Sequence, residues 1–382
     1  MFVFKSVPSY PIYPRINLNS NFGNRASKPG FFIHGNILIY LYHVPIKRKM
    51  KKISGLAVIL SVCIFSYLLL LSSGCKKKEN PIKYQYGTFS DSVYNLEGIN
   101  SAYDDKNSTV YSLPGSVPII FSSNRGSSGG QFDLVTGLIT FTFDQTNGNF
   151  DLSSTMITDP FYTAIANKAN TTGDDLGPYT SFVSSDGYEY LFVTSAGAGS
   201  QLDLFFERYL PKSGNNTPVI TGPNPVTVLN SSSDDAYFSF DSNQDSVYFC
   251  STRSGNYDIY VHHRPDTILF RNWLALPAAS SDLVDSLNSS AEDKCPFVYR
   301  NIMVFSSNRA GGLGGYDLYY SLFKNGKWNA PVNFGPPVNT EHNEYRPIIG
   351  TATNYTNRFM IFSSDRPGGK GGYDLYFTGL NL

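Results

Sequence analysis

The chain of 382 residues carries 30 basic and 30 acidic side chains, but residues 1–75 hold nine of the basic ones and no acidic one. The rest of the chain is therefore acidic, with 21 basic against 30 acidic residues, which argues against nucleic-acid binding. Aromatic residues make up 15% of the chain and charged residues only 16%, a composition typical of a β-rich protein.

The N-terminal region shows the pattern of an export signal. Residues 1–49 have no acidic residue and no coherent hydrophobic period, and we interpret them as an upstream extension from a misassigned start; the alternative is a cytoplasmic extension. A short basic segment begins at Met50, an apolar-rich run covers 56–71, and small residues precede Cys75. This order predicts a signal peptide over 50–74. An uncleaved helix is the alternative, although 16 residues are few for a membrane span.

Cys75 directly follows Gly74 and resembles the lipidated cysteine of bacterial lipoproteins. The match departs from the family at Ser72, where leucine is usual; the nearest leucine is Leu71. The resemblance implies an acyl chain on Cys75, a membrane anchor through that lipid, and a linker over 75–90. The residues after Cys75 are basic, which favours the periplasmic face of the outer membrane over the cell surface.

A repeated phrase dominates the rest of the chain. In the last copy, Phe362-Ser363-Ser364-Asp365-Arg366 leads through a Gly-rich loop to Tyr373-Asp374-Leu375. Copies of decreasing quality precede it, and the weakest, at Phe192-Val193-Thr194-Ser195-Ala196, lacks the arginine. The repeated arginines are Arg125, Arg253, Arg309 and Arg366, and the repeated aspartates are Asp133, Asp203, Asp258, Asp317 and Asp374. A repeat of this length predicts stacked or ring-like units.

Each unit has a second landmark, an acidic residue followed three positions later by proline or an aromatic residue. These acidic residues are Asp175, Asp235, Asp293 and Glu344. Short aromatic and aliphatic runs, separated by Gly, Asn, Asp and Pro, indicate strands and tight turns. One short helix is expected near 163–170.

These residues resemble the WD40-like β-propeller repeats of bacterial periplasmic proteins, which include the Tol-system propeller. The resemblance covers about 95–382 and is most specific from Trp328 through Glu344 to the last Gly-rich loop. It implies an all-β propeller of four-stranded antiparallel blades over 91–382. Five copies predict five blades, while the long interval between Asp133 and Asp203 leaves six as the alternative.

The last copy ends close to the C-terminus, so the final blade needs a strand from elsewhere. Ile82–Phe89 is the candidate, because pairing the first and last segments would close the ring and remove an exposed edge.

The repeated Arg and Asp residues are interpreted as structural, since a ligand site seldom needs a copy in every blade. The Gly-rich loops are interpreted as turns, because no helix follows them as a phosphate site requires. No catalytic residue, metal site or cofactor is predicted. Cys250 and Cys295 are left either as a disulfide or as two buried thiols.

The sequence therefore predicts a lipid-anchored envelope propeller that acts as a non-catalytic scaffold and binds an envelope protein. The alternative is an envelope glycan-binding protein or glycoside hydrolase, in which acidic residues such as Asp175, Asp235, Asp293 and Glu344 line the central funnel. Glycan or peptidoglycan is then the partner.

Overall fold

The computed structural model describes residues 55–72, 81–111, 116–197 and 199–382. The chain divides into two units, Met1–Lys78 and Glu79–Leu382. In the first unit, helix α1 (Gly55–Ser72) covers the predicted apolar run. Within the described ranges, no helix has the length and apolar character needed to cross a membrane. The predicted extension over 1–49 and the predicted lipid site at Cys75 lie outside the described residues.

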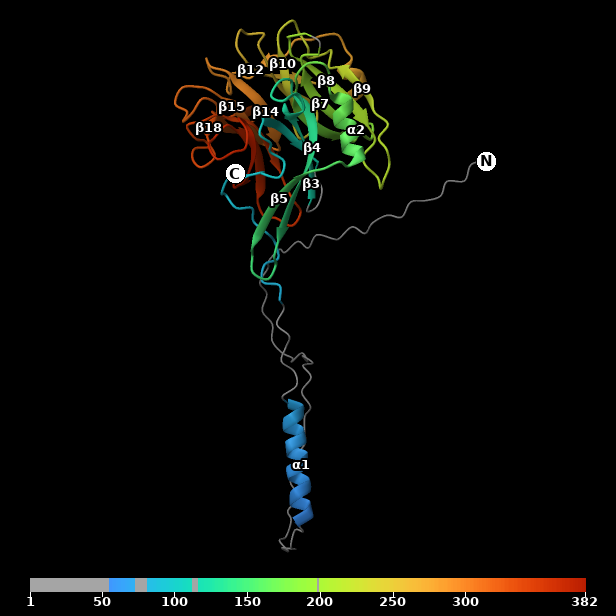
Figure 1. The fold of residues 1–382 in the computed structure, drawn as a ribbon, viewed down its shortest axis with the longest axis vertical. Coiled ribbons are helices and arrows are strands. Elements are labelled where there is room, and N and C mark those ends of the chain that lie inside the picture. The colour runs from blue at the N-terminus through green and yellow to red at the C-terminus, as the bar shows by residue number, and fades with distance from the viewer. Residues whose placement is uncertain (1–54, 73–80, 112–115, 198) are drawn as a thin grey trace, which may run out of the picture. The chain divides into compact units, whose positions relative to one another are not determined.

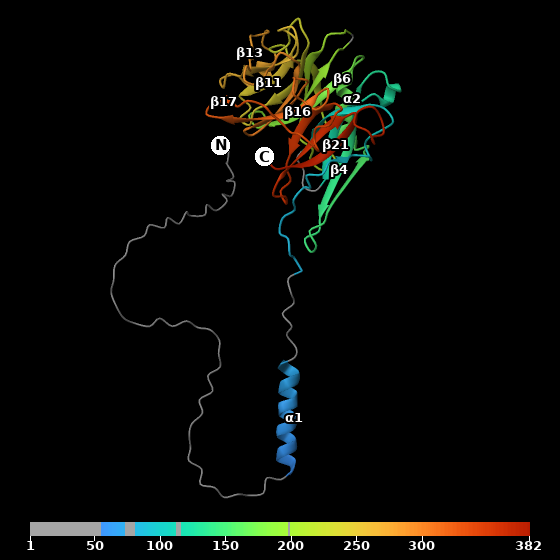
Figure 2. The same ribbon diagram turned by 90° about the vertical axis from the view of Figure 1, so that its left-hand side faces the viewer.

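The second unit is a five-bladed β-propeller of antiparallel sheets, which confirms the predicted fold class (Figures 1 and 2). The six-bladed alternative is wrong, since the strands of the described residues form five sheets. Blades I to III, from the innermost strand outwards, are β2–β5 (Asp105–Val110, Ser116–Ser123, Asp133–Phe143, Phe150–Met156), β6–β9 (Asp175–Val183, Tyr188–Ser195, Asp203–Tyr209, Thr221–Pro225) and β10–β13 (Asp235–Phe240, Ser246–Ser251, Asp258–His263, Asp282–Leu283).

Blade IV has two short segments at its outer edge, both paired with β16. Its strands are β14 (Asp293–Tyr299), β15 (Ile302–Ser307), β16 (Asp317–Lys324), β17 (Lys327–Trp328) and β18 (Val332–Asn333). Blade V combines both ends of the propeller: β19 (Glu344–Gly350), β20 (Arg358–Ser364), β21 (Asp374–Leu380) and, outermost, β1 (Tyr94–Asn95).

The ring closes at a different segment from the one expected. Strand β1 pairs with β21, so Tyr94–Asn95 supplies the missing outer strand. Ile82–Phe89 makes only one isolated bridge, between Gly87 and Tyr355, and its Phe89 ring stacks on Tyr355 at 3.9 Å between centroids. This segment therefore packs between blades I and V and does not extend the sheet of blade V.

Two helices and a 3-10 turn accompany the blades. Helix α2 (Pro160–Ala169) confirms the expected short helix; Asp159 caps it by accepting from the Phe161 amide at 3.0 Å. Helix α3 (Phe270–Leu274) buries Trp273, and η1 (Arg125–Ser127) lies in the first Gly-rich loop. The β4–β5 hairpin extends beyond the other blades in both views (Figures 1 and 2).

The five innermost strands surround the axis, each in contact with the next, in the order β2, β6, β10, β14, β19 and back to β2. Each strand starts with a buried acidic residue and is bulged against its neighbour two residues later. The bulged residues have positive φ and include four that are not glycine, namely Asn107, Tyr237, Cys295 and Arg346, beside Gly177. This repeated bend at the axis has no signal in the sequence.

Aromatic rings hold neighbouring blades together. Phe192 of blade II stacks on Phe238 of blade III with ring centroids 3.8 Å apart and planes 3° apart. Both lie in a buried cluster that also includes Trp273 of α3. Each blade can bury its two faces only against the neighbouring blades. The aromatic side chains between blades are therefore shielded from water only when all five blades have packed together.

Candidate functional site

The repeated arginines bind a different carboxylate from the one nearest in sequence. Each contacts the acidic residue that starts the innermost strand of its own blade: Arg125 with Asp105 at 2.5 Å, Arg253 with Asp235 at 2.5 Å, Arg309 with Asp293, and Arg366 with Glu344 at 3.0 Å. All four carboxyl side chains are fully buried. Each pair thus joins a Gly-rich loop to the start of an innermost strand.

The two serines of the phrase have separate tasks. The second serine accepts from the Nε of its own arginine, as Ser307 does from Arg309 at 2.9 Å. In two copies the first serine accepts from the bulged amide of the next blade: Ser306 from the Arg346 amide at 3.0 Å and Ser363 from the Asn107 amide at 3.1 Å. The hydroxyl of Ser122 has no hydrogen-bond partner among the described residues. The Ser-Ser-x-Arg phrase therefore orients one ion pair within a blade and, in these two copies, makes one contact between blades.

The repeated aspartates hold the Gly-rich loops. Asp133, Asp203, Asp258, Asp317 and Asp374 are the first residues of β4, β8, β12, β16 and β21. In the best-preserved copies they accept backbone amides of the loop: Asp317 from Leu313 at 2.6 Å, and Asp374 from Lys370 at 2.5 Å. These contacts fix the turns, and the aspartates themselves lie on the third strands, away from the axis.

Blade II departs from this pattern, and its register differs from the one predicted. Asp175 pairs with Ser195, just as Asp293 pairs with Ser307, so Gly197 occupies the place of the arginine and Val193 that of the phenylalanine. Asp175 is fully buried and accepts from the Thr171 amide at 2.6 Å, without an ion pair among the described residues. Burial raises the pKa of Asp175 to about 6.

The middle of the axis is filled by side chains. Arg346 of β19 is fully buried, and its Nη2 donates across the axis to the Pro178 carbonyl of β6 at 3.2 Å. The Tyr345 hydroxyl donates to the Tyr237 hydroxyl of β10 at 3.3 Å. Burial lowers the pKa of Arg346. This plug separates the acidic starts of the innermost strands from their opposite ends.

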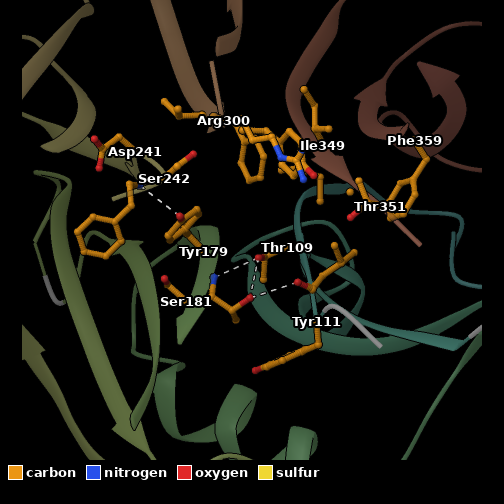
Figure 3. Close-up of a pocket in the computed structure, with 18 of the residues that line it drawn as sticks. Thr109, Tyr111, Tyr179, Ser181, Asp241, Ser242, Arg300, Ile349, Thr351 and Phe359 are labelled. Atoms are coloured by element: carbon orange, nitrogen blue, oxygen red, sulfur yellow. Dashed lines mark hydrogen bonds between the residues drawn. The ribbon is translucent and has the colours of Figure 1, made fainter. Parts of the chain in front are cut away.

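At those opposite ends the axis opens into a cavity of about 430 Å³, which we call the axial funnel (Figure 3). Every innermost strand contributes to its wall, either directly or through the residues that follow it. Labelled in Figure 3 are Thr109, Tyr111, Tyr179, Ser181, Asp241, Ser242, Arg300, Ile349, Thr351 and Phe359. Sequence reasoning missed the funnel, because these residues share no phrase and occupy no common motif position.

The funnel presents hydroxyl and amide groups on an apolar wall. Thr109 and Thr180 join their hydroxyls at 3.1 Å, and Gln244 donates its amide to the Ser181 hydroxyl at 2.9 Å. The Tyr179 hydroxyl accepts from the Phe240 amide at 3.2 Å, and burial raises its pKa. Fixed polar groups among aromatic and aliphatic side chains are typical of small-ligand sites.

Asp241 is the one acidic residue among the described residues that line the funnel. Its Oδ1 accepts from the Asp245 and Ser246 amides at 3.2 and 3.3 Å. Burial, followed by the neighbouring Asp245 carboxyl, raises the pKa of Asp241. The four acidic residues expected at the funnel mouth, Asp175, Asp235, Asp293 and Glu344, instead begin the innermost strands beyond the plug. That expectation is wrong, because each innermost strand starts at its acidic residue and reaches the funnel only at its other end.

Cys250 and Cys295 are free thiols that lie in one buried cluster. Cys250 occupies the place of the first serine of the phrase, and Cys295 is the bulged residue of the next blade. The contact between blades therefore brings them together although they are on different sheets. Burial raises the pKa of Cys295 to about 11, and that of Cys250 further.

Comparisons with known proteins identify no family. No family model and no curated protein matches this chain. Among solved structures, a thermostable family-43 glycoside hydrolase has 14% identity and a TM-score of 0.48, covering 77% of this chain and 93% of its own. An endo-arabinase from Bacteroides thetaiotaomicron has 13% identity and a TM-score of 0.47, with 77% and 98% covered.

Two expectations are corrected. The resemblance to WD40-like repeats is confirmed for the propeller fold, which the five sheets show, and not for the family, since no family model matches the chain. The prediction of a non-catalytic scaffold for an envelope protein is contradicted, because the similar solved structures are glycoside hydrolases. They agree better with the glycan-directed alternative. At this identity the likeness concerns the fold alone, so the ligand has to be argued from the funnel.

Proposed function

We propose that this protein binds a carbohydrate in the axial funnel. The observation that carries the proposal is the lining itself: hydroxyl, amide, carboxylate and guanidinium groups on an aromatic wall, within about 430 Å³. Sugars present hydroxyls that need fixed polar partners and C–H faces that pack on aromatic rings. The funnel offers both, with Tyr179 and Tyr299 near Arg300 and Asp241.

The proposal concerns binding. Glycoside hydrolysis ordinarily uses two carboxyl groups on either side of the bond, and Asp241 alone supplies one among the described lining residues. Similar solved structures include an α-L-arabinofuranosidase from Podospora anserina in complex with cellotriose, with 12% identity, a TM-score of 0.45, and 77% of this chain and 98% of that chain covered. Another is a xylosidase/arabinofuranosidase in complex with xylotriose. These two sugars serve as probes.

The test is titration calorimetry of the Met50-start protein with xylotriose, cellotriose and triacetylchitotriose. Thr351 is exposed at the funnel rim, so Thr351→Trp should narrow the funnel without disturbing the core. We expect at least one sugar to bind, and Thr351→Trp to weaken it at least about tenfold, equivalent to roughly 1.4 kcal/mol. Thr353→Trp, in the same loop but outside the funnel lining, is the matched control. Absence of binding by all three sugars, or equal effects of both variants, would refute the proposal.

We further propose that a lipid on Cys75 holds the propeller at the periplasmic face of the outer membrane. What supports this is the order of basic start, apolar run and small residues before Cys75. In cell fractionation, the Cys75→Ala variant should leave the membrane fraction while the parent protein stays in it. Equal membrane retention of both would contradict the lipid anchor.

A further inference from the structure

A second cavity adjoins the axial funnel. It has a volume of about 710 Å³ and lies between blades III and IV; we call it the lateral groove. The two cavities share four lining residues, Asp241, Ser242, Val298 and Arg300. The shared residues place the funnel and the lateral groove side by side.

The outer wall of the lateral groove is an aromatic hairpin. Phe323 and Trp328 pair across β16 and β17, their ring centroids 5.1 Å apart, and a two-residue Asn325-Gly326 turn with positive φ at both positions connects the strands. The Trp328 indole donates to the Tyr248 hydroxyl of blade III at 3.1 Å, which ties the hairpin across the groove. Trp328 is only 5% exposed, whereas Phe323 is 40% exposed.

Phe323 is thus a large apolar side chain that the fold supports and leaves open to solvent. Trp328 holds its ring from one side, so Phe323 is ordered by packing while it forms part of a concave wall. An ordered, exposed aromatic ring is a platform on which the apolar face of a sugar can pack.

Arg300 stands where the two cavities meet. It occupies the β14–β15 turn with φ of +54°, it is exposed, and it has no ion pair within the described part of the chain. Its guanidinium carbon lies 5.5 Å from the Tyr299 ring centroid, which orients the group. A guanidinium offers five N–H donors in a planar fork, suited to several acceptor oxygens at once.

We propose that the axial funnel and the lateral groove form one extended site for an oligosaccharide chain, with Arg300 between the subsites and Phe323 as the distal platform. This inference rests on the proposed carbohydrate binding and names its ligand class: a chain of several sugar units. One unit occupies the funnel, its neighbour donates or accepts at Arg300, and the following unit packs on Phe323. Each cavity alone has the volume of a small-ligand site.

The test compares chain lengths by ligand-observed NMR, with each trisaccharide used for the funnel set against its own monosaccharide: xylose, glucose or N-acetylglucosamine. We expect the trisaccharide to bind at least about tenfold more tightly, equivalent to roughly 1.4 kcal/mol. Phe323→Ala should remove most of that advantage and leave monosaccharide binding unchanged. Arg300→Ala should weaken both, because Arg300 lines both cavities.

Tyr103→Ala is the matched control, since Tyr103 is 38% exposed and lies in the loop before β2, away from both cavities. Equal affinity for monosaccharide and trisaccharide, with no effect of Phe323→Ala, would overturn the extended site while carbohydrate binding in the funnel stands. Failure of every sugar to bind would overturn both proposals. A circular dichroism melt of each variant shows whether a loss of binding comes from unfolding.

Discussion

Blade II and blade IV carry out the same architectural task with different chemistry. In blade IV, the buried Asp293 is neutralised by Arg309, and two glycines of the loop approach the next blade. In blade II, the equally buried Asp175 has no arginine partner among the described residues, but it keeps the contact with the preceding loop: it accepts from Thr171 as Asp293 accepts from Ser289. The contact with the preceding loop is therefore common to both blades, and the ion pair is an addition that blade II lacks.

A second buried carboxyl marks the same blade. Glu207 of β8 is fully buried, and its two carboxyl oxygens have no hydrogen-bond partner among the described residues. Burial raises the pKa of Glu207 to about 8, so the side chain is protonated at neutral pH. Blade II thus tolerates two weakly compensated acids, whereas the other blades pair the acid that starts their innermost strand.

The largest expected effect comes from breaking an ion pair in blade IV. Arg309→Ala would leave the buried carboxyl group of Asp293 without its cation, and we expect a loss of about 3 kcal/mol in the free energy of unfolding. Chemical denaturation measures this loss. Arg271→Ala, on the exposed side of α3, is the control. A loss no greater than in the control would mean that blade IV needs the pair no more than blade II does.

A smaller effect is expected from the glycine loops. A Cβ on Gly314 would lie 1.9 Å from the His342 carbonyl of the next blade, so Gly314→Ala must push two backbones apart. We expect a loss of about 2 kcal/mol in the free energy of unfolding. In blade II the position that corresponds to Gly314 is Ser200, and a Cβ on the neighbouring Gly199 would meet nothing closer than 3.6 Å. Gly199→Ala should be neutral in the same denaturation experiment, and equal losses would count against this difference.

The smallest effect is a dependence on pH that belongs to blade II. The pKa of Asp175 is raised from 3.8 to about 6 by burial, so the folded state binds its proton more tightly than the unfolded state. This contribution to stability is complete below pH 4 and is lost as pH rises through 6. Relative to the parent protein, Asp175→Asn should therefore gain stability, by about 1 kcal/mol, between pH 4 and pH 7.

Urea denaturation at several pH values between 4 and 7.5 measures that difference. Asp285→Asn, in an exposed loop, controls for the amide substitution itself. A difference between Asp175→Asn and the parent protein that stays constant over this range would show that Asp175 does not titrate there.

Much of the fold could be predicted from local patterns. The repeated Asp-Leu runs, with Asp-Ile in blade III, mark the third strand of each blade, and their number equals the number of blades, because each copy encodes one sheet. The register of blade II could not be predicted: Phe192 and Val193 both suit a buried strand, and only packing against blades III and I distinguishes them. The ring-closing strand is too short, at two residues, for any periodic signal.

The candidate site, in contrast to the fold, could not be predicted from the sequence. Thr109, Tyr179, Asp241, Arg300 and Thr351 come from five different blades and have no common motif, so nothing in the sequence joins them. The sequence by itself determined the repeat, the strand chemistry and the turns, because these depend on neighbours along the chain. Only the tertiary structure decided which carboxylate each arginine meets, where the ring closes, and that the ends of the innermost strands open into a funnel. Those features depend on how the blades pack around the axis, and packing brings together residues that the chain keeps apart.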